Sequence, residues 1–267
     1  MTIANYAQKT IVVTGAGGGL GRALCQEFIN VGANIAALDL DGTAVSMLSQ
    51  ELAGSGRMIG IACDVTDQAA CEAVMQQVIA RFGGIDVLIN NAGIAHRSPF
   101  GATGVAVIRR VMEVNFFGAV HCTKAALGTL IERRGQIVVI SSIAGFSPLS
   151  GRTGYSASKH ALHGFFDSLR SEIEQDGVGV SIICPSFIAT GIDRAALGGD
   201  GRPAALPRKT IGAEMTPEDM AKRIFSAVSR RQRLFLPTPL AWFSWWISRL
   251  APGFFARQMK RRVSGGK

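Results

Sequence analysis

The sequence is poor in cysteine and lacks any long uncharged apolar run. Its five cysteines are scattered and form no Cys-x-x-Cys pair. We therefore expect no disulfide framework and no metal site, and a reducing compartment fits this usage. The first ten residues hold no apolar run behind a basic cluster, so no secretory signal is predicted. No apolar stretch of about 18 residues predicts a membrane span, and the expected location is cytoplasmic.

Acidic residues are scarce in the last quarter of the chain. The whole chain has 28 Lys and Arg against 19 Asp and Glu, a net charge of +9. Residues 202–267 carry 14 basic and 3 acidic side chains, whereas residues 1–201 carry 14 basic and 16 acidic ones. The positive excess therefore belongs to the C-terminal region, and it bears on the partners of that region.

The remaining composition is that of a folded α/β protein. With 48% hydrophobic and 18% charged residues, the 267-residue chain can bury a large core. Short β-branched apolar segments alternate with longer amphipathic ones, which predicts a doubly wound parallel sheet covered by helices on both faces. Strands are expected at residues 11–13, 34–40, 58–63, 85–89, 136–141, 178–184 and 234–236, and helices at 20–31, 44–52, 68–82, 105–131 and 155–174.

The predicted organisation is one catalytic domain, residues 1–236, followed by a C-terminal aromatic and basic helical extension, residues 237–267. Within the domain, the Gly- and Pro-rich segment 197–207 interrupts the alternation and predicts a mobile loop.

A glycine-rich turn follows the first expected strand and precedes the first expected helix. This position is the one that a dinucleotide-binding turn requires, because a backbone without Cβ atoms can approach a pyrophosphate at a helix N-terminus. A tight turn without a ligand is the simpler alternative, but the position favours phosphate binding. The expected phosphate-binding residues are Gly15, Gly17, Gly18, Gly19, Leu20 and Gly21.

Asp39 ends the second expected strand, 24 residues after Gly15. A carboxylate at this point can accept hydrogen bonds from the adenosine ribose hydroxyls and would repel a 2′-phosphate, which favours NAD over NADP. Neither Leu40 nor Gly18 supplies a positive charge for such a phosphate. The alternative role of Asp39 is to cap the next helix, which Asp41 can do instead.

Two further groups of residues end strands on the same edge of the sheet. Asp64 and Val65 follow the third strand, where an adenine ring would lie, although Asp64 can equally cap its own turn. Asn91, Ala92 and Gly93 follow the fourth strand and are candidates for cofactor contact. For this second group, a structural role between adjacent strands is nearly as plausible.

Tyr155 and Lys159 are spaced four residues apart on one face of an expected helix. A phenol is a poor base at neutral pH, and a nearby ammonium group lowers its pKa. Ser142 ends the fifth strand and can hold a substrate oxygen, while alternation turns Ser141 the other way. Asn115 is an unusual residue inside a helix, and its amide can anchor a water that links Lys159 to solvent.

Together these motifs resemble the short-chain dehydrogenase/reductase family over roughly residues 8–192. The resemblance implies a Rossmann-type fold, a nicotinamide cofactor and a catalytic tetrad of Asn115, Ser142, Tyr155 and Lys159. Tyr155 would move the proton, Lys159 would lower its pKa and contact the nicotinamide ribose, and Ser142 would hold the oxyanion. The family often shows Pro-Gly and then Thr after the sixth strand, whereas this chain has Ser186 in place of the glycine. The cofactor contacts implied there are Pro185, Ile188 and Thr190.

The C-terminal extension contains all three tryptophans, Trp242, Trp245 and Trp246, close to clustered Lys and Arg. A short helix that is apolar nearly all round must be covered, either by a membrane surface or by another part of the protein. We expect peripheral membrane contact, with a subunit interface or substrate lid as the near-equal alternative. Nucleic acid is not an expected partner, because the basic residues alternate with bulky apolar ones.

The sequence thus predicts an oxidoreductase that uses NAD and a lipophilic secondary alcohol or ketone, of steroid-like, retinoid-like or long-chain type. The low charge of residues 190–213, which family members close over the substrate, supports an apolar pocket. His96 and Arg97 are expected on a loop surface, with contact to a polar end of the substrate as the alternative. The resemblance also implies a homodimer or homotetramer. Rival functions are an NADPH-dependent acyl-thioester reductase, a nucleotide-sensing protein without turnover, and a membrane-recruited scaffold.

Overall fold

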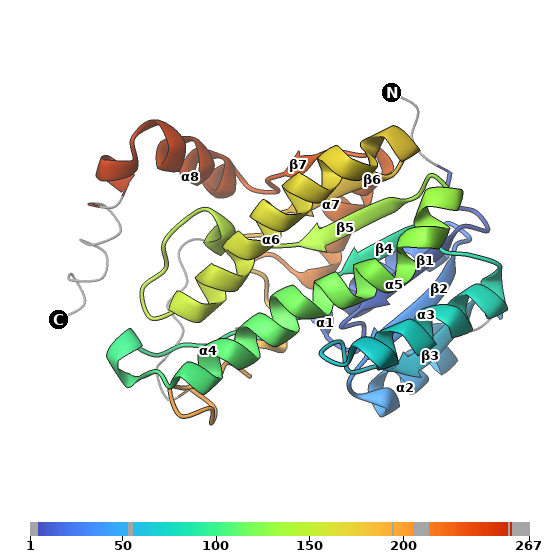
Figure 1. Ribbon diagram of the computed structural model, residues 1–267, viewed down its shortest axis with the longest axis horizontal. Coiled ribbons are helices and arrows are strands. Elements are labelled where there is room, and N and C mark those ends of the chain that lie inside the picture. Colours follow the sequence, from blue (N-terminus) through green and yellow to red (C-terminus); the bar gives the residue numbers. More distant parts are fainter. Residues whose placement is uncertain (1–4, 53–55, 194, 205–213, 256, 258–267) are drawn as a thin grey trace.

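The computed structural model describes residues 5–52, 56–193, 195–204, 214–255 and 257. Seven strands form one sheet in the order β3-β2-β1-β4-β5-β6-β7, and every neighbouring pair is parallel (Figure 1). All seven predicted strands are confirmed, with small shifts at their ends. They are β1 (Thr10–Thr14), β2 (Asn34–Asp39), β3 (Met58–Ala62), β4 (Val87–Asn90), β5 (Gln136–Ile140), β6 (Gly179–Ile183) and β7 (Leu234–Phe235).

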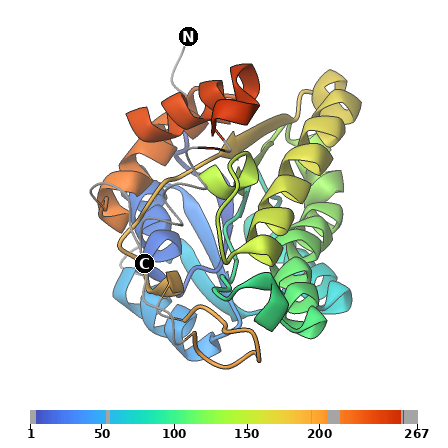
Figure 2. The same ribbon diagram turned by 90° about the vertical axis from the view of Figure 1, so that its left-hand side faces the viewer.

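Helices cover both faces of the sheet, as predicted, and Figure 2 shows the two helical layers on either side of it. One face carries α1 (Gly19–Asn30), α2 (Gly42–Leu52) and α7 (Pro217–Ser229), with Phe28 buried in its core. The other face carries α3 (Gln68–Phe82), α5 (Gly118–Glu132) and α6 (Thr153–Ile173), with Phe166 buried in its core. Because both faces are covered, the central strands β1, β4 and β5 are buried along their whole length.

Local sequence signals set several helix ends. The side chain of Asp67 accepts hydrogen bonds from the backbone N–H groups of Ala69 and Ala70, so Asp67 is the N-cap of α3. The same helix ends at Gly83 in the left-handed conformation, with φ +78°.

The predicted helix over residues 105–131 is continuous but not regular. It comprises α4 (Val105–Met112), a π-helical turn (Glu113–Phe117) and α5. Asn115 lies within the π-helical turn and is buried. Such turns inside α-helices are frequent at functional sites.

Helix α7 is not among the predicted elements, although its start carries clear signals. The Thr216 hydroxyl accepts a hydrogen bond from the N–H of Asp219, Pro217 occupies the first turn, and Glu218 adds an acidic side chain there. Met220, Ile224 and Val228 are buried at intervals of four residues, so the helix also carries an amphipathic pattern that the prediction missed.

The described part of the predicted loop over residues 197–207 is irregular, as predicted, and it is hydrogen-bonded to a neighbouring segment, while its mobility stays a prediction. Leu197 forms bridges to His96 and Pro203, and its N–H donates to the carbonyl of Ala95. The carbonyl of Gly199 accepts from Gly104, and a Cβ on Gly199 would overlap the Ala102 carbonyl. Residues 195–204 are therefore held against the segment that follows β4, while residues 205–207 lie outside the described residues.

Beyond β7 the chain forms α8 (Pro239–Leu250). Figure 1 places α8 at the end of the molecule to which the strand arrows point. Within the described ranges, no helix combines the length and the apolar character needed to cross a membrane.

Candidate active site

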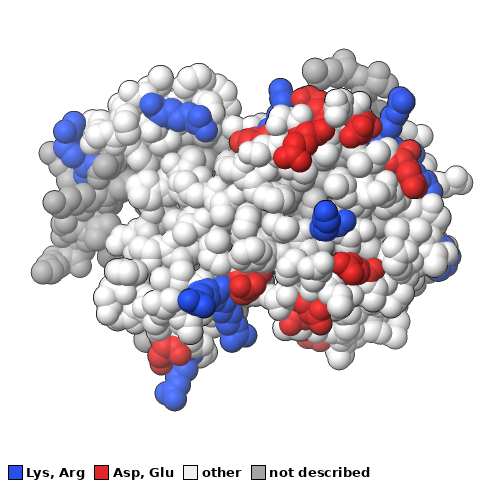
Figure 3. Space-filling model, viewed as in Figure 1, with Lys and Arg blue, Asp and Glu red and all other residues white. Residues whose placement is uncertain are grey.

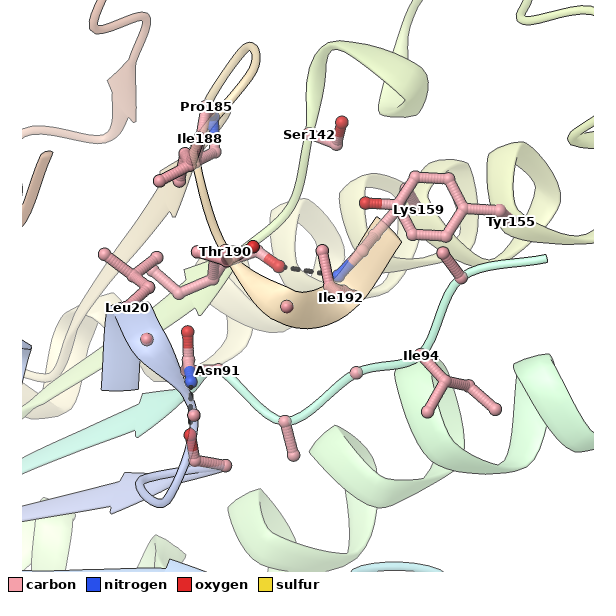
Figure 4. Close-up of a pocket in the computed structure, with 18 of the residues that line it drawn as sticks. Leu20, Asn91, Ile94, Ser142, Tyr155, Lys159, Pro185, Ile188, Thr190 and Ile192 are labelled. Carbon is pink, nitrogen blue, oxygen red and sulfur yellow. Dashed lines mark hydrogen bonds between the residues drawn. The ribbon is translucent and has the colours of Figure 1, made fainter. Parts of the chain in front are cut away.

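A cavity of about 350 Å³ opens at the carboxyl ends of the strands (Figure 4). Ligands of open parallel sheets bind at this edge. Most of the predicted site residues line the cavity, while Gly17, Asp64, Val65 and Asn115 do not. The predicted residues that do line it are Gly15, Gly18, Gly19, Leu20, Gly21, Asp39, Asn91, Ala92, Gly93, Ser142, Tyr155, Lys159, Pro185, Ile188 and Thr190.

The glycine-rich turn needs glycine at specific positions. Gly15 has φ +64°, and a Cβ there would lie 2.8 Å from the Cα of Ala92. A Cβ on Gly21 would overlap the carbonyl oxygen of Gly15. The turn therefore packs tightly on the end of β4, and it directs the N-terminus of α1 into the cavity, where a phosphate would be favoured.

Asp39 lies beside this turn at the end of β2. Its Oδ2 accepts from the N–H of Gly17 at 2.9 Å, and its Oδ1 accepts from the N–H of Asp41 at 3.0 Å. Each carboxylate oxygen retains further acceptor capacity toward the cavity. Asp41 caps α2 by accepting from Thr43 and Ala44, so the alternative role of Asp39 as a helix cap is already filled.

Asn91 joins β1 to β4. Its Nδ2 donates to the carbonyls of Thr14 and Gly15, at 2.9 and 3.0 Å. The Thr14 hydroxyl oxygen accepts from the N–H groups of Asn91 and Ala92. Asn91 and Thr14 thus hold the two strand ends together, which is the structural alternative, and because Asn91 also lines the cavity its contact with a cofactor stays a prediction. Thr14 is not among the predicted site residues, although its position directly before the glycine-rich turn is a signal that could have identified it.

Asp64 and Val65 follow β3 outside the cavity. The Asp64 carboxylate accepts from both the N–H and the hydroxyl of Thr66, at 2.9 and 2.7 Å. Asp64 therefore caps its own turn, which is the alternative to adenine contact that the sequence leaves open. The carbonyl of Val65 lies 3.0 Å from Nδ1 of His121. Their contact with an adenine ring stays a prediction.

Tyr155 and Lys159 lie one turn apart near the start of α6 and both line the cavity. The ammonium of Lys159 donates to the carbonyl of Ile140 at 2.8 Å and lies 5.8 Å from the centre of the Tyr155 ring. Lys159 is buried, and burial lowers the pKa of its ammonium from 10.5 to about 8. The pair therefore places a buried cation close to a phenol, which is the electrostatic arrangement that makes a phenol more acidic.

Ser142 and Ser141 diverge at the end of β5. The Ser142 hydroxyl accepts from the N–H of Ala144 at 3.1 Å, on the side of the cavity that Tyr155 also lines (Figure 4). The Ser141 hydroxyl instead donates to the carbonyl of Lys159 and lies 3.0 Å from Nε2 of His163. This divergence favours Ser142 as the substrate-facing serine.

Asn115 lies behind the cavity wall. Its Nδ2 donates to the carbonyl of Ile94 and to the hydroxyl of Ser158, both at 3.0 Å, and its Oδ1 accepts from the N–H of Ile94 at 2.7 Å. A Cβ on Gly93 would lie 3.2 Å from this Oδ1 and 3.7 Å from Nζ of Lys159. Asn115 and Lys159 thus flank Gly93, and both N–H donors of the amide are used to fix the cavity wall.

His96 is not a surface residue. It is fully buried, and its Nδ1 accepts from the backbone N–H of Tyr155 at 3.3 Å. Burial and the nearby Arg152 lower the pKa of the imidazole, which matches an acceptor nitrogen. The expectation of a loop-surface position is therefore wrong for His96: it satisfies an N–H of the first turn of α6. Arg97 is partly buried.

Ser186, in the position where family members commonly have glycine, lines the cavity. Among the described residues, only Gln8, Arg134 and Arg231 have positive φ without being glycine, so Ser186 adopts an ordinary backbone conformation. Its hydroxyl accepts a hydrogen bond from the hydroxyl of Thr238 at 3.3 Å. Thr238 is also the N-cap of α8, so the hydrogen bond between Ser186 and Thr238 links the cavity wall to that helix.

Comparisons with known proteins agree with this geometry. The family model described as short chain dehydrogenase matches residues 9–198. Dehydrogenase/reductase SDR family member 7B of Mus musculus is 40% identical over 261 residues, covering 95% of this chain and 80% of that protein. Its Bos taurus counterpart is 37% identical, covering 95% and 81%. A short chain dehydrogenase/reductase from Burkholderia phymatum, solved in complex with NAD, superimposes with a TM-score of 0.83 at 25% identity, covering 94% of this chain and 96% of that one.

Proposed function

The chain belongs to the short-chain dehydrogenase family and is an oxidoreductase acting on CH–OH or carbonyl groups, and on this premise we propose that it uses NAD and a lipophilic secondary alcohol or ketone. The observation that carries the proposal is the juxtaposition of Tyr155 with the buried ammonium of Lys159 in a cavity next to the glycine-rich turn.

The residues around the turn fit a dinucleotide. Gly15 and Gly21 leave space that a Cβ would fill, and the N-terminus of α1 suits a pyrophosphate. The carboxylate of Asp39 has acceptor capacity for ribose hydroxyls and would repel a 2′-phosphate, which favours NAD over NADP. Pro185, Ile188 and Thr190 line the cavity after β6, where the nicotinamide would lie. When bound, the oxidised nicotinamide supplies the hydride acceptor.

The chain's own residues then handle the proton and the oxygen. The Tyr155 phenolate removes the hydroxyl proton of the alcohol, or the phenol returns it in reduction. Lys159 favours the phenolate through its positive charge, and the Ser142 hydroxyl donates a hydrogen bond to the substrate oxygen. Asn115 and His96 are positioning residues. Asn115 holds the backbone of Ile94, and His96 holds the backbone of Tyr155.

The cavity walls favour an apolar substrate. Apart from the residues assigned to the reaction and to the dinucleotide, the cavity is lined by Ile94, Ile143, Leu149 and Ile192, and also by the charged Arg152. Apolar walls with few polar groups select ligands that bury carbon surface and are oriented by one oxygen.

The test is a panel of alcohols and ketones of increasing apolar size, assayed for reduced-nicotinamide absorbance with NAD, NADP and their reduced forms. We expect turnover with NAD or NADH and a rise in kcat/KM with apolar size. Turnover of acyl thioesters with NADPH alone would favour the rival reductase, and no turnover with any pair would favour a protein that only binds nucleotide.

We further propose that the enzyme is a homodimer or homotetramer, as the members of this family commonly are. Sedimentation velocity of the purified protein tests this, and a monomer at micromolar concentration would contradict it.

A further inference from the structure

Helix α8 turns large apolar side chains outward. Trp242, Phe243 and Leu250 are exposed to 55%, 67% and 75%, and Trp246 to 41%. Among the α8 side chains that the structure describes, the fully buried one is the small Ala241. A surface helix normally has the opposite polarity, with its apolar stripe facing the core.

The helical spacing of Trp242, Phe243, Trp246 and Leu250 puts them on one face of α8. The rings of Trp242 and Trp246 lie 5.6 Å apart, and Trp246 contacts Trp245 edge-on at 5.0 Å. Phe254, which follows the helix, is 47% exposed. We call this surface the α8 face: Trp242, Phe243, Trp246, Leu250 and Phe254. Contiguous exposed apolar surface on a folded chain marks a binding surface.

The charge on α8 and after it has one sign. From residue 239 to residue 267 the sequence contains six Lys and Arg and no Asp or Glu. The guanidinium of Arg249 lies 4.5 Å from the centre of the Trp245 ring, and Arg257 is exposed beyond the helix. In Figure 3, blue side chains accompany α8 without red ones, while the acidic side chains on this face lie over the rest of the molecule.

We propose that the α8 face docks on an anionic lipid surface, with its aromatic and aliphatic side chains in the headgroup layer and the basic residues paired with lipid phosphates. Tryptophan, phenylalanine and leucine beside Lys and Arg suit such an interface. A second copy of the chain suits it less, because a symmetric contact would bring two basic surfaces together.

The α8 face is connected to the candidate active site. The hydroxyl of Thr238 accepts from the N–H of Ala241 at the start of α8 and donates to Ser186, which lines the cavity. The helix also packs against the turn Ile143–Gly145, whose first residue lines the cavity. Docking would thus place the cavity near the lipid from which an apolar substrate comes, a consequence that rests on the proposed function.

Because all three tryptophans lie in α8, intrinsic tryptophan fluorescence reports on this helix alone. The full-length protein is titrated with phosphatidylcholine vesicles and with vesicles that also contain phosphatidylglycerol. We expect a blue shift and vesicle cosedimentation with the anionic vesicles, weakened at about 1 M NaCl, where the Debye length is about 3 Å.

A pair of double variants sharpens the test and keeps the tryptophans. Phe243→Ser/Leu250→Ser should weaken partitioning about tenfold or more, because both side chains would lose their burial in lipid. The control, Met47→Ser/Val105→Ser, removes two side chains of similar exposure (63% and 64%) elsewhere and should change partitioning less than about twofold.

Three outcomes would overturn the proposal: no shift with anionic vesicles, equal partitioning of both double variants, or a lipid-independent shift that grows with protein concentration and tracks dimer formation. Turnover of a water-soluble alcohol without vesicles is measured on the same samples. Both variants should retain it, so a failure of docking is distinguishable from a failure of the proposed reaction.

Discussion

At the residue scale, the phenol of Tyr155 is the group on which the proposed reaction depends. In Tyr155→Phe the ring keeps its place on α6, but no group remains to take the proton. We expect kcat to fall by about 10²–10⁴-fold, the usual contribution of a positioned acid or base. Steady-state rates measure this, and calorimetric NAD affinity within about threefold of wild type is the control. Turnover near the wild-type rate would remove Tyr155 from the chemistry.

The buried ammonium of Lys159 gives a pH-dependent prediction. Its pKa is about 8 in the folded protein and 10.5 as a free side chain, because burial penalises the charge. Between these pH values the unfolded chain holds a proton that the folded chain lacks, so this group makes the wild type more stable as pH rises. Below about pH 8 the full penalty is present.

The variant Lys159→Met removes that penalty. The unfolding free energy of the variant minus that of the wild type should therefore be largest below about pH 8 and should decrease by on the order of 3 kcal/mol up to pH 10.5. Denaturant unfolding at a series of pH values measures it. If the difference in unfolding free energy did not change with pH, burial would not lower the pKa of Lys159 in the folded protein.

Asp39 determines the proposed cofactor preference. In Asp39→Asn the carboxylate charge is lost while the side chain keeps its size beside Gly17. Hydrogen bonds to a charged group contribute about 1.5–3 kcal/mol, so NAD affinity should fall about 10–100-fold and the preference over NADP should narrow. Calorimetric titration with both cofactors measures this, with Asp176→Asn as an exposed control. An unchanged NAD to NADP ratio would contradict the role of Asp39.

At the scale of elements, the π-helical turn between α4 and α5 positions Asn115 against the loop after β4. Replacement by Leu would remove the partner of the N–H and C=O of Ile94, while the Ser158 hydroxyl would keep its hydrogen bond to the carbonyl of Tyr155. We expect Asn115→Leu to lower stability by about 3 kcal/mol or more, since each buried unsatisfied group costs about 1–3 kcal/mol. Thermal unfolding measures the loss, and kcat/KM should fall as well, because Ile94 lines the cavity.

The matched control is Asn30→Leu at the end of α1. Asn30 is exposed, and its side chain accepts a hydrogen bond from Gln26 within the same helix. Its replacement should change stability by less than about 0.5 kcal/mol. Equal effects of the two variants would show that the Asn115 hydrogen bonds carry no special weight.

The elements differ in how far their sequence determines them. Strand β1 and helix α3 are predictable, because an apolar run or an N-cap such as Asp67 is a local signal. Helix α7 is predictable in the same way, from the cap Thr216 and from Met220, Ile224 and Val228 at intervals of four residues, although it is absent from the predicted elements. The π-helical turn has no local signature beyond the unusual Asn115.

At the scale of the whole molecule, the cavity joins residues from the ends of five strands, β1, β2, β4, β5 and β6, and from α1 and α6. A ligand that binds there stabilises the complete fold, because the unfolded chain has no such site. At 100 times its Kd, NADH should add about 2.7 kcal/mol. For a chain of this length the Tm should then rise by about 5–10 °C in a thermal scan. An unchanged Tm at saturating NADH and NADPH would contradict a dinucleotide site.

The sequence by itself determined the parallel sheet, the glycine-rich turn and the candidate reacting residues, because these depend on periodicity and on spacing along the chain. Only the tertiary structure decided what each polar group does. His96 was expected on a loop surface, but it is buried and accepts a hydrogen bond from the first turn of α6. Burial also lowers the pKa of Lys159. The outward direction of the apolar side chains of α8 also depends on which side of that helix meets the protein. Packing partners distant in sequence set burial, and local pattern does not encode them.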